Sequence, residues 1–173
     1  HYQMFPQSKL YQGMSMVVGG SSALEQFRPD AYSGDLSAII IRNLPIWVEM
    51  RRTPIIEVAL MEGWEEKVDR MAQETMREDV RTIAGVPSWT LVILRRILEL
   101  TGKRNIMEVW PNLELFMHGG VSFRPYRDQF RSLDDPGERE GPVLLELTAT
   151  EIGWRTMLGS RLREPHRPGS WIE

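Results

Sequence analysis

Residues 80–130 read VRTIAGVPSWTLVILRRILELTGKRNIMEVWPNLELFMHGGVSFRPYRDQF, and this stretch decides the fold. Its first apolar run, 80–84, predicts a buried strand. The residues 85–88, which read Gly-Val-Pro-Ser, turn that strand into a helix with a proline in its first turn. The helix is expected to reach Leu100, because Gly102 is typical of the position just past a helix end.

The helix that starts near Pro87 has an apolar face and a polar side. Its apolar residues recur at helical spacing and are Leu91, Leu94 and Leu98, extended by Val92, Ile93 and Ile97. Its polar residues are Arg95, Arg96 and Glu99. The pattern predicts a helix that covers a sheet with its apolar face.

A second strand, 113–117, is expected to run into the turn His118-Gly119-Gly120-Val121, and a further helix is expected over 124–133. Strands that alternate with helices indicate an α/β fold, here a mostly parallel sheet flanked by helices. Ligands in such sheets bind outside the carboxyl ends of the strands. A glycine pair at a strand end lets backbone amides approach a ligand, although a plain strand exit is the alternative interpretation.

The N-terminal half contributes another strand and more helices. Residues 14–18 form a short apolar run that predicts a strand, which the following Gly19-Gly20-Ser21-Ser22 ends; a plain strand exit is favoured there over a phosphate cradle. The apolar segment 35–48 predicts two short, deeply buried helices, because Pro45 interrupts it. Residues 62–77 predict an amphipathic surface helix with Trp64, Val68, Met71 and Thr75 on its inner face.

The C-terminal part gives fewer signals. A polar loop over 134–141 precedes a strand expected at 142–147. Residues 155–173 are rich in Arg, Pro and Gly and lack an amphipathic pattern. We expect this tail to be poorly ordered and not to dock into the core.

Composition excludes several classes of protein. Of the 173 residues, 42% are hydrophobic and 26% are charged, which is typical of a globular domain. The formal net charge of −3 offers no basic field for nucleic acid. The chain has no cysteine, which excludes disulfides and thiolate chemistry. Neither a membrane-spanning run nor a signal peptide is visible, so we expect no nucleic-acid or membrane partner.

Several motifs together resemble one family. They occur in that family's order over roughly residues 10–133 and are Val17-Val18-Gly19-Gly20-Ser21, Gly34-Asp35-Leu36-Ser37-Ala38, Ala59-Leu60-Met61-Glu62-Gly63-Trp64-Glu65, Gly85-Val86-Pro87-Ser88-Trp89, Trp110-Pro111-Asn112-Leu113, His118-Gly119-Gly120-Val121 and Pro125-Tyr126. In these motifs the chain is similar to the auxin-responsive acyl-acid-amido synthetases, in particular their bacterial members. These enzymes belong to the adenylate-forming superfamily.

The resemblance implies an ATP-dependent ligase that activates a carboxylic acid as an acyl-adenylate and conjugates it to an amino acid. It implies ATP and Mg²⁺ as cofactors and a cytoplasmic location. It assigns residues 1–154 to part of the large N-terminal acyl-adenylating domain, with the phosphate loop before residue 1 and the C-terminal domain absent. The chain alone is therefore expected to be an inactive internal fragment. An acyl-CoA synthetase-like ligase and a noncatalytic interaction domain are the alternatives.

The resemblance also assigns site residues. For the nucleotide these are Gly119, Gly120, Val121, Thr150 and Glu151; for the acyl pocket they are Pro87, Ser88, Trp89 and Val121; for the metal it is Glu151. The last motif departs from the family pattern, because Thr148 stands where the family has Tyr and Ile152 separates Glu151 from Gly153.

The residues themselves leave simpler interpretations open. Ser88 has two equally supported roles, capping of the helix and contact with a ligand. Core packing is favoured for Trp89 and Trp110. His118 has no Ser, Asp or Cys constellation nearby in the sequence, so a loop residue or pocket wall is favoured over a catalytic base.

Overall fold

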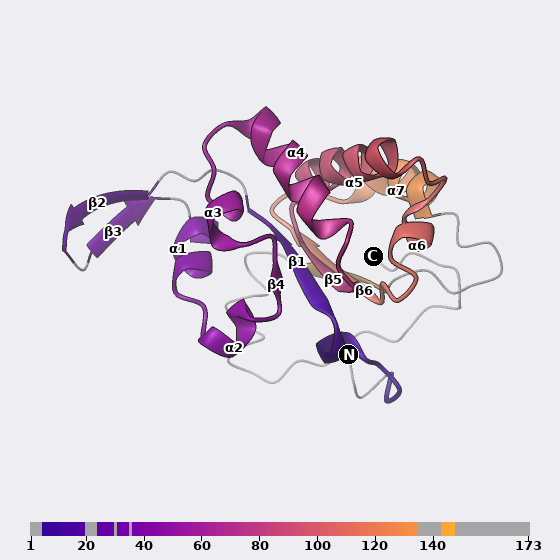
Figure 1. Ribbon diagram of the computed structural model, residues 1–173, viewed down its shortest axis with the longest axis horizontal. Coiled ribbons are helices and arrows are strands. Elements are labelled where there is room, and N and C mark those ends of the chain that lie inside the picture. The colour runs from indigo at the N-terminus through magenta and orange to yellow at the C-terminus, as the bar shows by residue number, and fades with distance from the viewer. Residues whose placement is uncertain (1–4, 20–23, 30, 35, 135–142, 148–173) are drawn as a thin grey trace.

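A five-stranded parallel sheet forms the body of the computed structural model, which describes residues 5–19, 24–29, 31–34, 36–134 and 143–147 (Figure 1). The strand order is β4-β1-β5-β6-β7, and every described pair is parallel. The strands are β1 (Met14–Val18), β4 (Arg52–Thr53), β5 (Val80–Gly85), β6 (Leu115–Gly119) and β7 (Val143–Leu147). The predicted α/β fold with a parallel sheet is confirmed.

Helices connect these strands. They are the 3₁₀ turn η1 (Leu10–Gln12), α1 (Leu36–Arg42), α2 (Ile46–Glu49), α3 (Ile56–Ala59), α4 (Trp64–Thr75), α5 (Pro87–Thr101), α6 (Ile106–Val109), the 3₁₀ turn η2 (Arg124–Tyr126) and α7 (Arg127–Asp134). A separate antiparallel hairpin, β2 (Leu24–Arg28) and β3 (Ala31–Gly34), projects from the left side of the view in Figure 1. Within the described residues, no helix is both long and apolar enough to cross a membrane.

The strand predictions agree with the structure to within two residues. β1 has the predicted bounds, β5 includes one further residue, and β7 begins one residue later than predicted. The prediction of 113–117 is shifted, because β6 begins at Leu115. The amide of Leu113 instead donates to the carbonyl of Trp110 at 3.1 Å and closes a turn. A local hydrogen bond therefore delays the start of this strand.

Helix α5 begins near the predicted position and ends at Thr101, one residue later than predicted. Pro87 occupies its first turn, and Gly102 ends it with a φ of 65° while donating its amide to the carbonyl of Leu98 at 2.9 Å. Most of the predicted apolar face is buried. Val92 is an exception with 43% of its surface exposed, because it lies at the border of the face that packs on the sheet.

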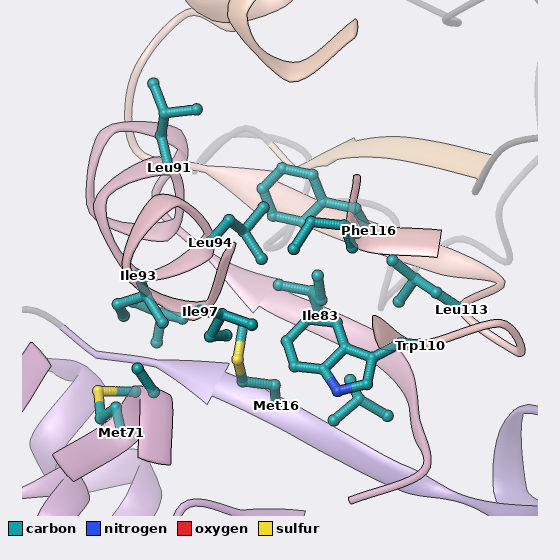
Figure 2. Close-up of a cluster of buried hydrophobic side chains, with 14 of the residues drawn as sticks. Met16, Met71, Ile83, Leu91, Ile93, Leu94, Ile97, Trp110, Leu113 and Phe116 are labelled. Atoms are coloured by element: carbon teal, nitrogen blue, oxygen red, sulfur yellow. The ribbon is translucent and has the colours of Figure 1, made fainter. Parts of the chain in front are cut away.

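The core lies between the sheet and helices α4 and α5 (Figure 2). Met16, Ile83 and Phe116 stand side by side on β1, β5 and β6 and point toward α5, as their strand register requires. Leu94 and Ile97 of α5 cover them. This apolar layer supplies the main stabilisation of the fold, because burial of apolar surface is its dominant favourable term.

Trp110 packs in the core, as the sequence predicts. It is 1% exposed, and its Nε1–H donates to the carbonyl of Thr75 at 3.1 Å. The indole thereby ties the segment before β6 to the end of α4. A buried indole N–H needs such a partner, because leaving it unpaired costs about 1–3 kcal/mol.

The segment 35–48 differs from the prediction of two short, deeply buried helices. It does form two helices on either side of Pro45, and the first buries Ala38 and Ile41 at 1% and 3% exposure. The second helix is not deeply buried, because Ile46 is 79% exposed and Trp47 is 66% exposed. Helix α2 is a single turn, held by a hydrogen bond of 2.8 Å from Arg52 Nε to Glu49 Oε2. This link fixes α2 at the edge of the molecule, with its apolar side chains outward. Asp35, the first residue of this segment, lies outside the described residues.

Candidate functional site

The carboxyl ends of three strands meet at one edge of the sheet. Val18 of β1 pairs with Gly85 of β5, and Gly85 pairs with His118 of β6. The turns after β5 and β6 are therefore neighbours. A Cβ added to Gly120 would lie 3.4 Å from Val86 Cγ2, which shows how close the two turns come. The structure thus brings together the two segments that the family resemblance assigns to the acyl and nucleotide sites.

The turn after β5 is closely packed. A Cβ at Gly85 would lie 2.7 Å from Val18 Cβ and 2.9 Å from the carbonyl oxygen of Val18. Such distances leave no room for a side chain, so glycine is required here by the approach of β1. The backbone of Gly85 has no left-handed conformation.

The prediction that Ser88 caps helix α5 is wrong. Val86 occupies the N-cap position of α5 with an extended backbone, and no side chain caps this end. Ser88 lies one residue inside the helix, after Pro87, and is half-buried. A cap must precede the first helical residue, and the proline moved that boundary two residues upstream of the serine. Contact between Ser88 and a ligand stays a prediction.

Trp89 packs where α4 and α5 begin. Its ring lies edge-to-face on Trp64, with 4.1 Å between centroids and an interplanar angle of 83°. Both indoles are half-buried and border the hydrophobic core. Core packing of Trp89 agrees with the sequence prediction, while its role in an acyl pocket stays a prediction.

The turn after β6 has a different character. Gly120 has a φ of 81° and is exposed, and the next residue, Val121, is 42% exposed. A positive φ is a left-handed conformation that glycine adopts without steric strain. The backbone at Gly120 is therefore open to solvent at the carboxyl edge of the sheet, which fits the approach of a ligand to its main chain.

His118 is not a loop residue, so that prediction is wrong, whereas its role in a pocket wall stays a prediction. It belongs to β6 and is 2% exposed. Its ring stacks on Phe123 with 4.5 Å between centroids and lies 5.4 Å from the ring of Phe116. Within the described part of the chain, neither ring nitrogen has a hydrogen-bond partner. Burial lowers the pKa of His118 from 6.5 to about 4, so the imidazole is neutral near pH 7 and is a weak base.

Thr90 is a buried polar residue beside the candidate site that sequence reasoning missed. It is fully buried in the first turns of α5, and its Oγ1 has no partner among the described residues. That oxygen lies 3.1 Å from the position of a Cβ at Gly85. The only sequence signal was a polar residue on the apolar face of the helix, one position before Leu91.

Thr150 and Glu151 of the predicted site fall outside the described residues. The same applies to the segment Gly20-Ser21-Ser22 and to the tail 155–173, so the predictions for these segments stay predictions. In the part of the chain that the structure does describe, no three His, Cys, Asp or Glu side chains gather as they would around a metal ion. The assignment of a metal to Glu151 therefore stays a prediction.

Comparison with protein families gives one match. A family model described as the GH3 family N-terminal domain matches residues 8–135, which include both turns of the candidate site. Comparison with the curated proteins and with the solved structures gives no match.

Proposed function

The chain belongs to the GH3 family, the auxin-responsive acyl-acid-amido synthetases, and from this premise we propose that it contributes the acid and nucleoside sites of an ATP-dependent ligase that joins a carboxylic acid to an amino acid. The family in general consists of acyl-adenylate-forming ligases. We also propose a cytoplasmic location, as the family resemblance implies.

The proposed reaction has two steps. A carboxylate oxygen of the acid attacks the α-phosphorus of ATP, which forms the acyl-adenylate and releases pyrophosphate. The amine of the amino acid then attacks the acyl carbon, forms an amide after losing a proton, and releases AMP. Catalysis of this kind depends on positioning and on neutralisation of the developing negative charge.

The proposal rests on the strand register between Gly85 and His118. That register places the turn after β5 beside the turn after β6, and both lie within the family match. We propose that the main chain of Gly119 and Gly120 faces the adenosine. Pro87, Ser88, Trp89 and Val121 then border the acyl group. Thr150 and Glu151 are proposed to complete the nucleotide site.

The described residues fit the two proposed cofactors unequally. The exposed left-handed turn at Gly120 suits a nucleoside, because no side chain blocks the main chain there. A divalent cation requires oxygen ligands, and within the described ranges no acidic cluster offers them. Mg²⁺, when bound, neutralises phosphate charge, and we propose Glu151 as its ligand.

The test is carboxylate-dependent exchange of labelled pyrophosphate into ATP, followed by an acceptor assay. It is run on the natural protein that contains residues 1–173. We expect exchange with a subset of a broad panel of acids and amide formation with an amino acid. Transfer to coenzyme A would instead favour the acyl-CoA synthetase alternative. A folded protein that gives no exchange with any acid would overturn the enzyme proposal.

A further inference from the structure

One buried side chain does not match its surroundings. His118 lies among the rings of Phe116, Phe123 and Phe130, whose centroids are 5.1–6.4 Å from one another. His118 is itself 2% exposed and stacks on Phe123 with an interplanar angle of 27°. A fourth phenylalanine at position 118 would match this aromatic cluster in shape and polarity. Packing alone therefore does not explain why the residue is a histidine.

The imidazole also lacks the partners that a buried polar group normally has. Neither Nδ1 nor Nε2 of His118 has a hydrogen-bond partner among the described residues. Buried polar groups are nearly always paired, and those that are not are frequently functional. Position 118 immediately precedes the Gly119-Gly120 turn at the carboxyl edge of the sheet, where α/β proteins bind ligands.

The covering ring and the exposed turn belong to one segment. Residues 120–122 are exposed, and Phe123, which stacks on the imidazole, ends this segment. Phe123 is itself buried in the core, so access to the imidazole requires a shift of this turn that moves Phe123 off the ring. Gly120 gives the turn the conformational freedom that such a shift needs.

The neutral state of His118 limits which chemical groups can bind to its ring. Desolvation lowers the pKa of His118 to about 4, so one ring nitrogen donates and the other accepts near pH 7. Phosphate and carboxylate groups accept hydrogen bonds and prefer cationic partners. A neutral imidazole in an apolar cluster is better matched to an uncharged group that both donates and accepts, such as the edge of a base or a ribose hydroxyl.

We propose that His118 is a binding residue for the uncharged nucleoside part of the nucleotide, retained at this position at the expense of folding stability. This inference rests on the proposed function, since it takes the ligand of the β6 turn to be a nucleotide. It adds a side-chain contact to a turn for which only main-chain contacts were expected.

The experiment measures affinity and stability together in the same natural chain that is used for the exchange assay. Calorimetric titrations use three probes: adenosine, ATP and inorganic tripolyphosphate. In His118→Phe we expect at least a tenfold loss of affinity for adenosine and ATP, unchanged affinity for tripolyphosphate, and a melting temperature that rises by a few degrees. His118→Gln, which keeps a donor and an acceptor, should retain adenosine affinity within about threefold.

Met117→Leu is the matched control, because Met117 is the preceding residue on β6, is half-buried and faces the opposite side of the sheet. It should leave all three affinities unchanged. Equal adenosine affinity in His118→Phe and in the unchanged chain would overturn this inference and leave the proposed function standing. A lower melting temperature in His118→Phe would also overturn it, because the imidazole would then have a stabilising partner in the fold. If the folded, unchanged chain binds neither adenosine nor ATP, the nucleotide site of the proposed function fails as well.

Discussion

The two strand ends at the carboxyl edge both carry glycine, but they need it for opposite reasons. At the end of β5, Gly85 has an ordinary backbone and no space, since a Cβ would lie 2.7 Å from Val18 Cβ. At the end of β6, Gly120 has a φ of 81° and open surroundings, with its nearest contact at 3.4 Å. The first glycine serves packing, and the second serves the shape and accessibility of a turn.

The same contrast extends to the polar side chains at each end. Thr90 lies against Gly85 and His118 precedes Gly119, and both are buried with polar atoms that lack partners among the described residues. A threonine hydroxyl does not titrate, whereas an imidazole does. The β5 end is thus a closely packed wall, whereas the β6 end is the exposed side of the candidate site.

Replacement of Gly85 tests the packed end and should have the largest effect. In Gly85→Ala the new methyl group meets the Val18 carbonyl, so β1 and β5 must separate. We expect a loss of about 3 kcal/mol in the free energy of unfolding, at the upper end for overpacked sites. Urea denaturation measures it. A loss below about 1 kcal/mol would show that β1 yields easily and that the wall is not rigid.

Acid should lower the free energy of unfolding through His118 at the β6 end, whereas Thr90 at the β5 end does not titrate. Because the folded pKa of His118 is about 4 and the unfolded value is 6.5, the unfolded chain takes up the proton first. Stability is therefore full above pH 6.5 and falls as the pH drops toward 4. Between pH 7 and pH 5 we expect a loss of about 2 kcal/mol, at about 1.4 kcal/mol for each pH unit below 6.5.

The control for this acid effect is His118→Phe, in which the loss between pH 7 and pH 5 should disappear. The carboxylates contribute at lower pH: hydrogen bonds from Arg52 hold the pKa of Glu49 below its usual 4.5. An equal loss in the unchanged chain and in His118→Phe would assign the effect to another group.

Replacement of Gly120 tests the open end and should have a smaller effect on folding. Gly120→Ala places a Cβ on a left-handed residue, which costs about 1 kcal/mol, but the new Cβ meets only an ordinary van der Waals contact, at 3.4 Å from Val86 Cγ2. We expect ATP affinity to fall by at least tenfold, because the methyl group stands where the main chain is proposed to face the nucleoside. Calorimetric titration and thermal melting are measured on the same sample. Unchanged ATP affinity would remove this turn from the nucleotide site.

Pro87→Ala should have the smallest effect. Pro87 occupies the first turn of α5, where its fixed φ limits the unfolded chain and its missing N–H is not needed. We expect a loss of about 0.5 kcal/mol with unchanged nucleotide affinity. A loss several times larger would mean that the buried ring of Pro87 contributes packing that the wall requires.

Sequence patterns predicted the central elements well for identifiable physical reasons. Helix α5 carries its own boundaries, a proline in the first turn and a left-handed glycine at Gly102. Strands β1 and β5 are short apolar runs with glycine at or just after the end. Helix α6 was missed although a signal exists: the side chain of Asn105 accepts a hydrogen bond from the amide of Glu108 at 2.9 Å and caps the helix.

Other features could not be read from the sequence. Strand β4 consists only of Arg52 and Thr53, and its pairing with β1 is a tertiary contact without an apolar pattern. The sequence could not show that the apolar side chains of α2 face outward. Apolar periodicity predicts a helix, but it does not tell whether other parts of the protein cover the apolar face. In the candidate site, the resemblance named the two turns. The absence of a hydrogen-bond partner for His118 depends on neighbours that only the fold brings together.

The order of strands in the sheet also has a consequence for how the chain folds. β5 and β6 are adjacent in the chain apart from the helices α5 and α6, whereas β1 joins β5 only after a hairpin and helices α1–α4 have been looped out. Closing the longer loop costs more entropy before any contact compensates for it. We therefore expect β5, α5 and β6 to form the nucleus, with β1 arriving later against Gly85. The absence of a Cβ at that glycine then matters most in the late stage of folding, when the sheet closes.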